Sequence, residues 1–248
     1  MLVRRDVVTV YKQTLLGPLW LFIQPLLTSG TQFIIFNQVA GLQTDGLPAF
    51  LFYLTGNVFW SYFATCTINT SNIFVGNKDL FGKVYFPRTV VPLSLAVSTL
   101  VKLGLQLLLF AFFWVWYWYH GSIHPTPAAL LLPVHVLMMA LLGLGIGMIA
   151  SSLSTRYRDV SFLIGFAVQL LMFLTPVIYP LSLAKGLLRK CIEANPMTGI
   201  IESIRHGFLG SGAADTHMLI YSYSFCVALF MLALLIFNRT EKAFIDTV

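Results

Sequence analysis

The stretch "VVPLSLAVSTLVKLGLQLLLFAFFWVWYWY", residues 90–119, decides the class of fold. Lys102 is its single charged residue. The run exceeds the about 20 apolar residues that a helix needs to cross the hydrocarbon core of a bilayer. Trp and Tyr crowd its last residues, as they do where hydrocarbon meets lipid headgroups. The stretch therefore predicts one membrane-spanning helix that ends at the membrane surface.

The rest of the chain repeats this pattern. Of its 248 residues, 58% are hydrophobic and 10% are charged, whereas soluble globular domains carry about 25% charged residues. We therefore predict an all-α integral membrane protein, with residues 1–248 forming a single transmembrane domain. Apolar runs separated by charged or proline-containing turns give six expected spans. They are residues 19–39, 49–74, 90–119, 128–153, 160–178 and 218–237.

The distribution of positive charge predicts the orientation in the membrane. Most Lys and Arg residues outside the expected spans fall on one side, and a smaller group falls on the other, within residues 181–217. The larger group is Arg4, Arg5, Lys12, Lys78, Lys83, Arg88, Arg156, Arg158, Arg239 and Lys242, and the smaller is Lys185, Arg189, Lys190 and Arg205. Cytoplasmic loops are enriched in Lys and Arg. Both termini are therefore expected in the cytoplasm, and the net charge of +6 needs no nucleic-acid partner.

Residues 1–17 have the pattern of an amphipathic helix. Val3, Val7 and Val10 recur at a spacing of three to four residues, whereas Arg5 and Lys12 fall on the other side. A basic amphipathic helix of this kind lies in the membrane interface rather than across the membrane. We predict an interface helix here. The alternative is a short cytosolic tail whose periodicity is accidental.

The segment "NKDLFGKVYFPR", residues 77–88, separates two of the expected spans and is called the coupling segment below. It is both charged and aromatic, although a solvated turn needs no aromatic residues. The residues that give it this character are Lys78, Asp79, Phe81, Lys83, Tyr85, Phe86 and Arg88. We predict that this segment docks onto a second protein. The turn "STRYRD", residues 154–159, is charged in the same way through Arg156, Arg158 and Asp159.

Lys102 is the basic residue that lies well inside a span. Placing a lysine at the bilayer centre costs about 2.5–3.5 kcal/mol on insertion scales, so its position needs a reason. Gln106 lies four residues further on and shares its helix face. This polar face lines a conduit or a buried partner contact in one interpretation. In the other, the lysine reaches back to the cytoplasmic headgroups.

The aromatic run at the end of residues 90–119 also has two interpretations. It is an aromatic belt at the membrane surface, or a platform on which the apolar C–H edges of sugar rings stack. The residues concerned are Trp114, Trp116, Tyr117 and Trp118.

Residues 181–217, called the gate region below, are amphipathic and irregular. They predict two short helices, at 183–192 and 198–209, separated by Asn195-Pro196 and dipping into the outer leaflet. Glu202 and Arg205 are three residues apart, so an ion pair on one helix face is expected.

Several functional classes lack their motifs in the sequence. The chain has no GxxxxGK[ST] phosphate loop, HExxH motif or nucleophile elbow, so we expect neither an enzyme nor an ATP-binding protein. The "GLGIG" run lies inside an apolar segment, where Gly143 and Gly147 form a GxxxG pattern that lets helices approach closely. The cysteines form no paired pattern, and His120 and His124 lie in a proline-rich loop, so no metal or cofactor site is expected.

Five segments in order resemble the transmembrane subunit of ABC exporters for bacterial surface polysaccharides, namely O-antigen, capsule and teichoic acid. They are "RRDVVTVYKQTLLGPLWLFIQPL" (4–26), "LFGKVYFPRTVVPLS" (80–94), "STRYRDVSFLIGFAVQLLMFLTPVIYP" (154–180), "NPMTGIIESIR" (195–205) and "FNRTEKAFIDTV" (237–248). The chain departs from the family pattern at its start, because members usually have a longer cytoplasmic lead before the first of these segments.

The resemblance implies six spans in the bacterial inner membrane, two copies of the chain, and two copies of a cytosolic ATPase that binds ATP and Mg²⁺. The coupling segment looks like the family's coupling helix, residues 154–159 like a second contact with the ATPase, and the gate region like its external gate, including Asn195, Pro196, Glu202 and Arg205. The implied substrate is a lipid-linked glycan, whose pyrophosphate the basic residues Arg4, Arg5 and Arg88 would attract. The alternatives are an ABC permease for drugs, ions or small lipids, and an autonomous channel or secondary carrier.

Overall fold

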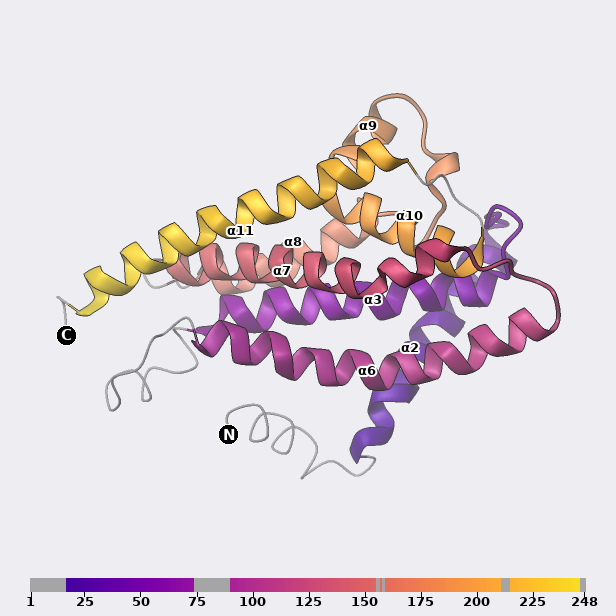
Figure 1. The fold of residues 1–248 in the computed structure, drawn as a ribbon, viewed down its shortest axis with the longest axis horizontal. Helices are drawn as coiled ribbons and strands as arrows, with labels where there is room; N and C mark the ends of the chain where they lie inside the picture. Colours follow the sequence, from indigo (N-terminus) through magenta and orange to yellow (C-terminus); the bar gives the residue numbers. More distant parts are fainter. Residues whose placement is uncertain (1–16, 74–89, 155–156, 158, 211–214, 246–248) are drawn as a thin grey trace.

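The computed structural model describes residues 17–73, 90–154, 157, 159–210 and 215–245, and within them every regular element is helical (Figure 1). The predicted all-α class is therefore confirmed. The α-helices are α2 (Trp20–Gln32), α3 (Ala49–Ser71), α6 (Val90–Tyr119), α7 (Leu132–Ser154), α8 (Asp159–Phe173), α9 (Gly186–Ala194), α10 (Pro196–Leu209) and α11 (Thr216–Ile245). Short helices of other types are η1 (Gly17–Leu19), η2 (Phe33–Val39), η3 (Pro127–Leu131) and η4 (Leu181–Leu183), of which η2 is a π-helix.

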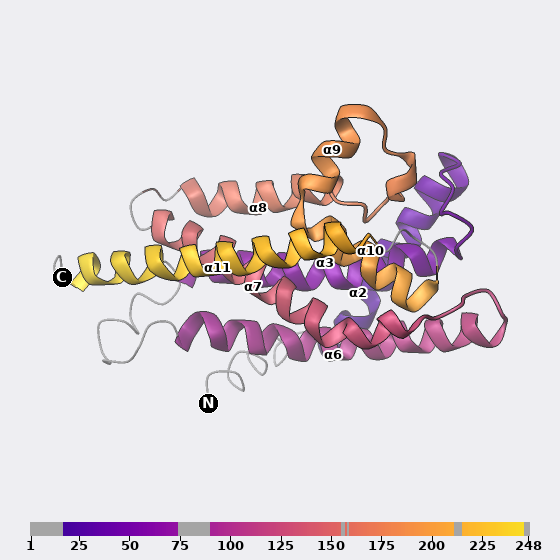
Figure 2. The ribbon, with the colours of Figure 1, turned by 45° about the horizontal axis from the view of Figure 1, so that its top comes forward.

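The long helices form an elongated bundle with two different ends (Figures 1 and 2). At one end, α3, α7 and α11 finish and α6 and α8 begin. At the other end lie α9 and α10, together with the loops that precede α3 and follow α6 (Figure 1). Several predicted sites lie outside the described residues. They are the interface helix, except for its last residue Gly17, the coupling segment, Arg156 and Arg158.

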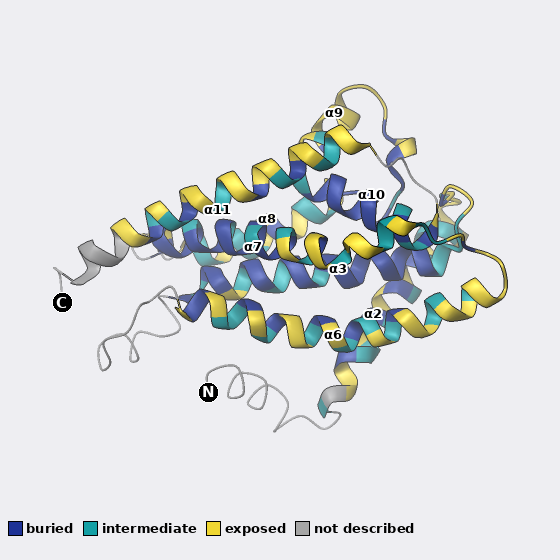
Figure 3. Ribbon diagram, viewed as in Figure 1, coloured by how far each residue is buried: buried dark blue, intermediate teal, exposed yellow. Residues whose placement is uncertain are grey.

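Among the described residues, three helical stretches are long and apolar enough to cross a membrane: Val90–Tyr119, Pro127–Ser154 and Thr216–Arg239. Helix α8 is apolar but shorter. Helix α3 is buried on nearly all sides by the rest of the bundle, as its dark blue ribbon shows (Figure 3). Because protein rather than lipid surrounds it, α3 accommodates buried polar residues such as Thr55 and Asn57. The predicted number of six spans stays a prediction.

Helices α3 and α7 pack closely through the GxxxG pattern. A Cβ atom added to Gly147 would lie 2.5 Å from the Thr70 Cβ, and one added to Gly143 would lie 3.2 Å from the Cys66 Cβ. Gly145 faces the other way, where an added Cβ would lie 3.4 Å from the backbone of Phe230 in α11. The predicted close approach is confirmed, and α7 uses its glycines to pack against two helices.

Replacing Gly147 by Leu is expected to destabilise the bundle by about 1–3 kcal/mol or more, because the new side chain overlaps Thr70 across a tight helix contact. Gly104→Leu on α6 is the matched control, since a Cβ there meets no atom within 4 Å. Unfolding of the two variants in detergent, followed by circular dichroism, compares them. Equal stability of the two variants would show that the α3–α7 contact is not tight.

The gate region differs from its prediction at the helix boundaries. The first short helix begins at Gly186 rather than at 183, because Leu181–Leu183 form a separate 3-10 turn and Gly186 has a positive φ of 59°. The second begins at Pro196 rather than at 198. The expected fifth span is also shorter, because α8 ends at Phe173 and an irregular turn follows.

Candidate functional site

Helix α10 is the buried centre of the candidate site. Its start is fixed by Asn195, whose Oδ1 accepts a hydrogen bond from the Met197 backbone N–H at 3.0 Å. The Asn195 amide donates to Thr175 Oγ1 at 2.7 Å and to the Leu174 carbonyl at 3.2 Å. Pro196 follows at a position where a helix needs no N–H donor. Asn195 therefore both caps α10 and ties it to the turn that follows α8.

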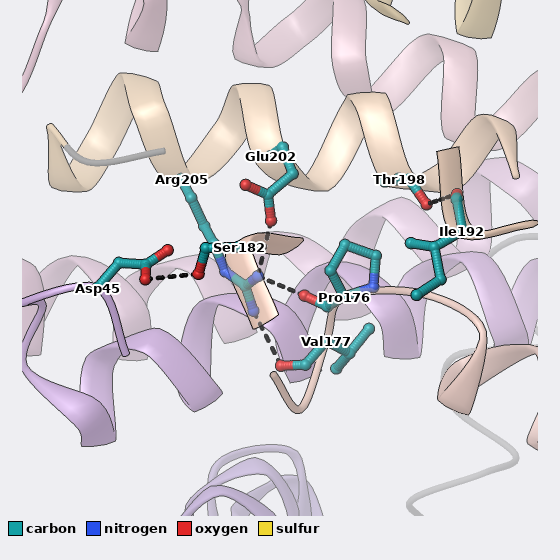
Figure 4. A network of polar contacts seen from close by, with 8 residues as sticks. All are labelled: Asp45, Pro176, Val177, Ser182, Ile192, Thr198, Glu202 and Arg205. Atoms are coloured by element: carbon teal, nitrogen blue, oxygen red, sulfur yellow. Dashed lines mark hydrogen bonds and ion pairs between the residues drawn. The ribbon is translucent and has the colours of Figure 1, made fainter. Parts of the chain in front are cut away.

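Arg205 completes this connection from the middle of α10 (Figure 4). Its side chain is 1% exposed, and Nη1 donates to the Pro176 carbonyl and to Glu202 Oε1, the latter at 3.2 Å. Nη2 donates to the Val177 carbonyl at 2.8 Å. The irregular turn after α8 leaves these carbonyls without helical partners, and the guanidinium supplies the donors. The predicted ion pair of Glu202 with Arg205 is present.

Helix α3 is shaped to accept this arginine. The Arg205 Cζ lies 3.5 Å from the centroid of the Phe52 ring, a cation–π contact. A Cβ atom added to Gly56 would lie 2.9 Å from the Val177 carbonyl oxygen and 3.1 Å from Arg205 Nη2. A larger residue at position 56 would therefore separate α3 from both. Burial raises the pKa of the Glu202 carboxyl, and the adjacent Arg205 guanidinium opposes that rise.

A second buried network joins α10 to α7 and α11, and the sequence did not predict it. His135 of α7 is 1% exposed and uses both ring nitrogens, sharing hydrogen bonds with Ser203 at 3.2 Å and with the Tyr223 hydroxyl at 2.6 Å. The signal that points to such a partnership is a histidine inside an apolar helix, where an unpaired imidazole is costly.

The gate region also contacts two loops at its end of the bundle. The Thr126 N–H donates to the Gly207 carbonyl at 2.8 Å, and the Ser182 hydroxyl donates to Asp45 Oδ1 at 2.7 Å. The Ser182 contact with Asp45 is visible beside Arg205 in Figure 4. Helix α10 is thus held by the loops as well as by the helices around it.

The aromatic run on α6 divides into two parts. Trp114 and Tyr117 are half-buried, and Trp114 Nε1 donates to the Phe208 carbonyl of α10 at 2.8 Å. Trp116 and Trp118 are 58% and 54% exposed, and the Trp118 ring stacks on Trp114 at 5.6 Å. Trp114 therefore helps to hold α10. Contact of the exposed rings with membrane or sugar stays a prediction.

Lys102 and Gln106 lie on one face of α6, as expected. Gln106 is buried, and within the described part of the chain its Oε1 has no hydrogen-bond partner. Lys102 is half-buried.

Asp159, the last residue of the charged segment 154–159, is exposed and occupies the first position of α8. A carboxylate at the start of a helix interacts favourably with the helix dipole. Among the described residues, no cluster of three His, Cys, Asp or Glu side chains could hold a metal.

Comparison with known proteins decides the family. The family model of ABC-2 type transporters matches residues 1–209, which include the whole of α10. The chain belongs to the ABC-2 type transporter family. This match confirms the family predicted from the sequence, and this ABC-2 type chain is an integral membrane protein.

Two proteins similar to this ABC-2 type chain along its length carry the same name, O-antigen export system permease protein RfbA. The one from Myxococcus xanthus is 28% identical over 252 residues, which cover 100% of this chain and 94% of that protein. The one from Klebsiella pneumoniae is 26% identical over 243 residues, which cover 98% of this chain and 91% of that protein.

Proposed function

We propose that this chain is the transmembrane half of an ATP-driven exporter that moves a lipid-linked surface polysaccharide of the O-antigen type across the bacterial inner membrane. The observation that carries the proposal is the similarity of this chain to two proteins named as O-antigen export permeases, which covers almost the entire length of this chain and of each relative. Membership of the ABC-2 type transporter family supports it. Deleting the gene tests it: lipid-linked glycan should accumulate on the cytoplasmic face of the membrane. Normal surface glycan in the deletion strain would overturn it.

In this proposal the chain spans the membrane six times. Three of the spans are the long apolar stretches, and the other three are α8, the central α3, and α2 together with η2. The ends of α3, α7 and α11 lie at one end of the bundle (Figure 1), which is the end that the excess of Lys and Arg assigns to the cytoplasm. The gate region then lies on the outer side.

A cysteine at Ser182 tests this orientation. Ser182 is exposed in the gate region, so S182C should react with a membrane-impermeant maleimide added outside intact spheroplasts. The background should carry Cys191→Ala, because Cys191 is exposed as well, whereas Cys66 and Cys226 are buried. Reaction from the inside alone would invert the topology.

The energy comes from a separate partner in this proposal. The chain has no phosphate-binding loop, so two copies of a cytosolic ATPase bind ATP and Mg²⁺ and drive two copies of this chain. The coupling segment and the 154–159 turn are the points where the ATPase acts.

Helix α8 connects one of these points to the gate. It begins at Asp159, the last residue of the charged segment 154–159, and the turn after its end at Phe173 is held by Asn195 and Arg205 of the gate region. Because hydrogen bonds fasten that turn to α10, a displacement of α8 by the ATPase would carry α10 with it. The path opened in this way would release the glycan that enters from the inner leaflet.

Replacing Lys102 by Leu tests whether the polar face of α6 lines the path. Lys102 is half-buried and, among the described residues, forms no ion pair. If it lines the conduit, K102L should lower the export rate severalfold while leaving thermal stability near that of the wild type. Lys102→Arg, which keeps the charge, is the control. An unchanged export rate in K102L would favour a lysine that only reaches the headgroups.

A further inference from the structure

Helix α9 is attached to the bundle beside the start of a long apolar helix. Leu181, Ala184 and Ile192 form a small buried cluster that packs against Tyr179 and Met218. The Tyr221 hydroxyl donates to the Ala194 carbonyl at 2.9 Å. Both contacts with α11 involve its first turns, where an apolar stretch of membrane-spanning length begins (Figure 1). Helix α9 is therefore held at the level where hydrocarbon gives way to lipid headgroups.

The apolar face of α9 extends beyond Ile192, and its outer part is uncovered. Leu187 is 78% exposed and Leu188 is 53% exposed, and Leu183 in the preceding turn is 46% exposed. Cys191 is exposed and, four residues after Leu187, lies on the same face of the helix. Three leucines presented together at the edge of a protein indicate a contact with something apolar.

The same segment is positively charged. Lys185, Arg189 and Lys190 are all exposed. Arg189 pairs with Glu193 at 2.7 Å, whereas neither lysine has an acidic partner among the described residues. In the proposed orientation these cations lie on the side of the membrane that usually carries few Lys and Arg residues, so the positive-inside rule does not explain them.

We propose that α9, with the preceding residues from Leu183, is an interfacial lipid-binding element, which inserts Leu183, Leu187 and Leu188 between acyl chains and binds anionic phospholipid headgroups with Lys185 and Lys190. Leucine side chains below a rim of lysines are the arrangement by which amphipathic helices bind anionic membranes. The argument from charge rests on the orientation given under the proposed function, in which the gate region lies on the outer side of the membrane.

A second copy of the chain fits this surface less well. In a two-fold symmetric contact the same patch faces itself, so Lys185 and Lys190 would approach their own copies. Their repulsion opposes such a contact, whereas a surface of phosphate groups neutralises them.

Lipid binding by α9 would also affect the position of α10. Helix α9 ends at Ala194, and Asn195 starts α10 directly afterwards. An α9 held on the membrane surface fixes one end of the helix that carries Glu202 and Arg205, so the lipid composition of this leaflet bears on the position of the gate region.

The native Cys191 allows a direct test with the full chain. An environment-sensitive fluorophore on Cys191 reports on this site, because Cys66 and Cys226 are both buried and 0% exposed. The protein is reconstituted in phosphatidylcholine vesicles with or without phosphatidylglycerol, and the fluorophore is quenched by lipids that carry a spin label at the headgroup or by iodide in the water.

We expect lipid quenching to dominate in vesicles that contain phosphatidylglycerol. Each lysine near an anionic surface raises the equilibrium constant for membrane binding about fivefold. K185Q/K190Q should therefore lower the ratio of lipid-contacting to water-exposed probe by about 25-fold. R189Q/E193Q is the matched control, because it removes an exposed ion pair without changing the net charge, and it should behave like the wild type.

Three results would overturn the proposal. The first is a probe quenched by iodide in every vesicle, which leaves α9 in water. The second is lipid quenching that is equal with and without phosphatidylglycerol and insensitive to K185Q/K190Q. The third is efficient disulfide formation between Cys191 residues of two copies, which would make this surface a contact between chains.

Discussion

Arg205→Leu is expected to destabilise the protein by about 3–5 kcal/mol, because breaking a buried ion pair leaves a buried charge without compensation. Glu202 would lose its cation, and the carbonyls of Pro176 and Val177 would lose their donors. The measurement is the free energy of unfolding in detergent. The gate region should unfold locally more readily than the rest of the bundle, so R205L should raise amide hydrogen exchange in α10 more than in α3.

Two further variants make this result interpretable. Arg189→Leu removes an exposed ion pair, with side chains 51% and 39% exposed, and should change stability by less than about 1 kcal/mol. E202L/R205L removes both buried charges and should be more stable than R205L alone, since no unpaired charge remains. If R205L matched the wild type within 1 kcal/mol, the Arg205 network would not hold the gate region.

The second large effect is expected in the coupling segment. F81A/Y85A should reduce export to background while ATP hydrolysis by the complex continues, because in the proposed function these apolar side chains are the ones that the ATPase holds. Insertion of the chain into the membrane should be unchanged. Export assayed together with phosphate release, in vesicles containing both subunits, measures the two quantities.

A conservative pair provides the control for this prediction. F81L/Y85F keeps apolar side chains of similar size in the coupling segment and should retain most of the export. Wild-type export by F81A/Y85A would remove the argument that this segment transmits force. So would a variant that lost hydrolysis and export together, since that result indicates a general failure of assembly.

The apolar helices were the most predictable part of the fold. Residues 90–119 were expected as one helix, and α6 spans Val90–Tyr119. The composition of such a run alone determines its structure, because a bilayer tolerates few unpaired backbone groups. Asn195-Pro196 likewise indicated a boundary, since asparagine is favoured at the N-cap of a helix and proline at its first position.

Other parts could not be predicted because tertiary contacts determine them. The central position of α3 depends on which helices surround it, which its own residues do not reveal. The Glu202–Arg205 pair followed from spacing, but the carbonyls of Pro176 and Val177 lie more than 25 residues away in the chain. The partners of His135 lie on two other helices, so no local pattern could identify them. The roles predicted for Lys102 and for the exposed tryptophans still await experiment.

In the proposed function the chain is a passive pathway that moves its substrate only when a separate ATPase drives it. The most direct test reconstitutes the purified chain in vesicles with a fluorescent lipid-linked glycan, with and without the partner ATPase and ATP. We expect ATP-dependent movement of the glycan across the membrane when both subunits are present and no movement when the chain is alone. Directional movement by the chain alone, without nucleotide, would contradict it.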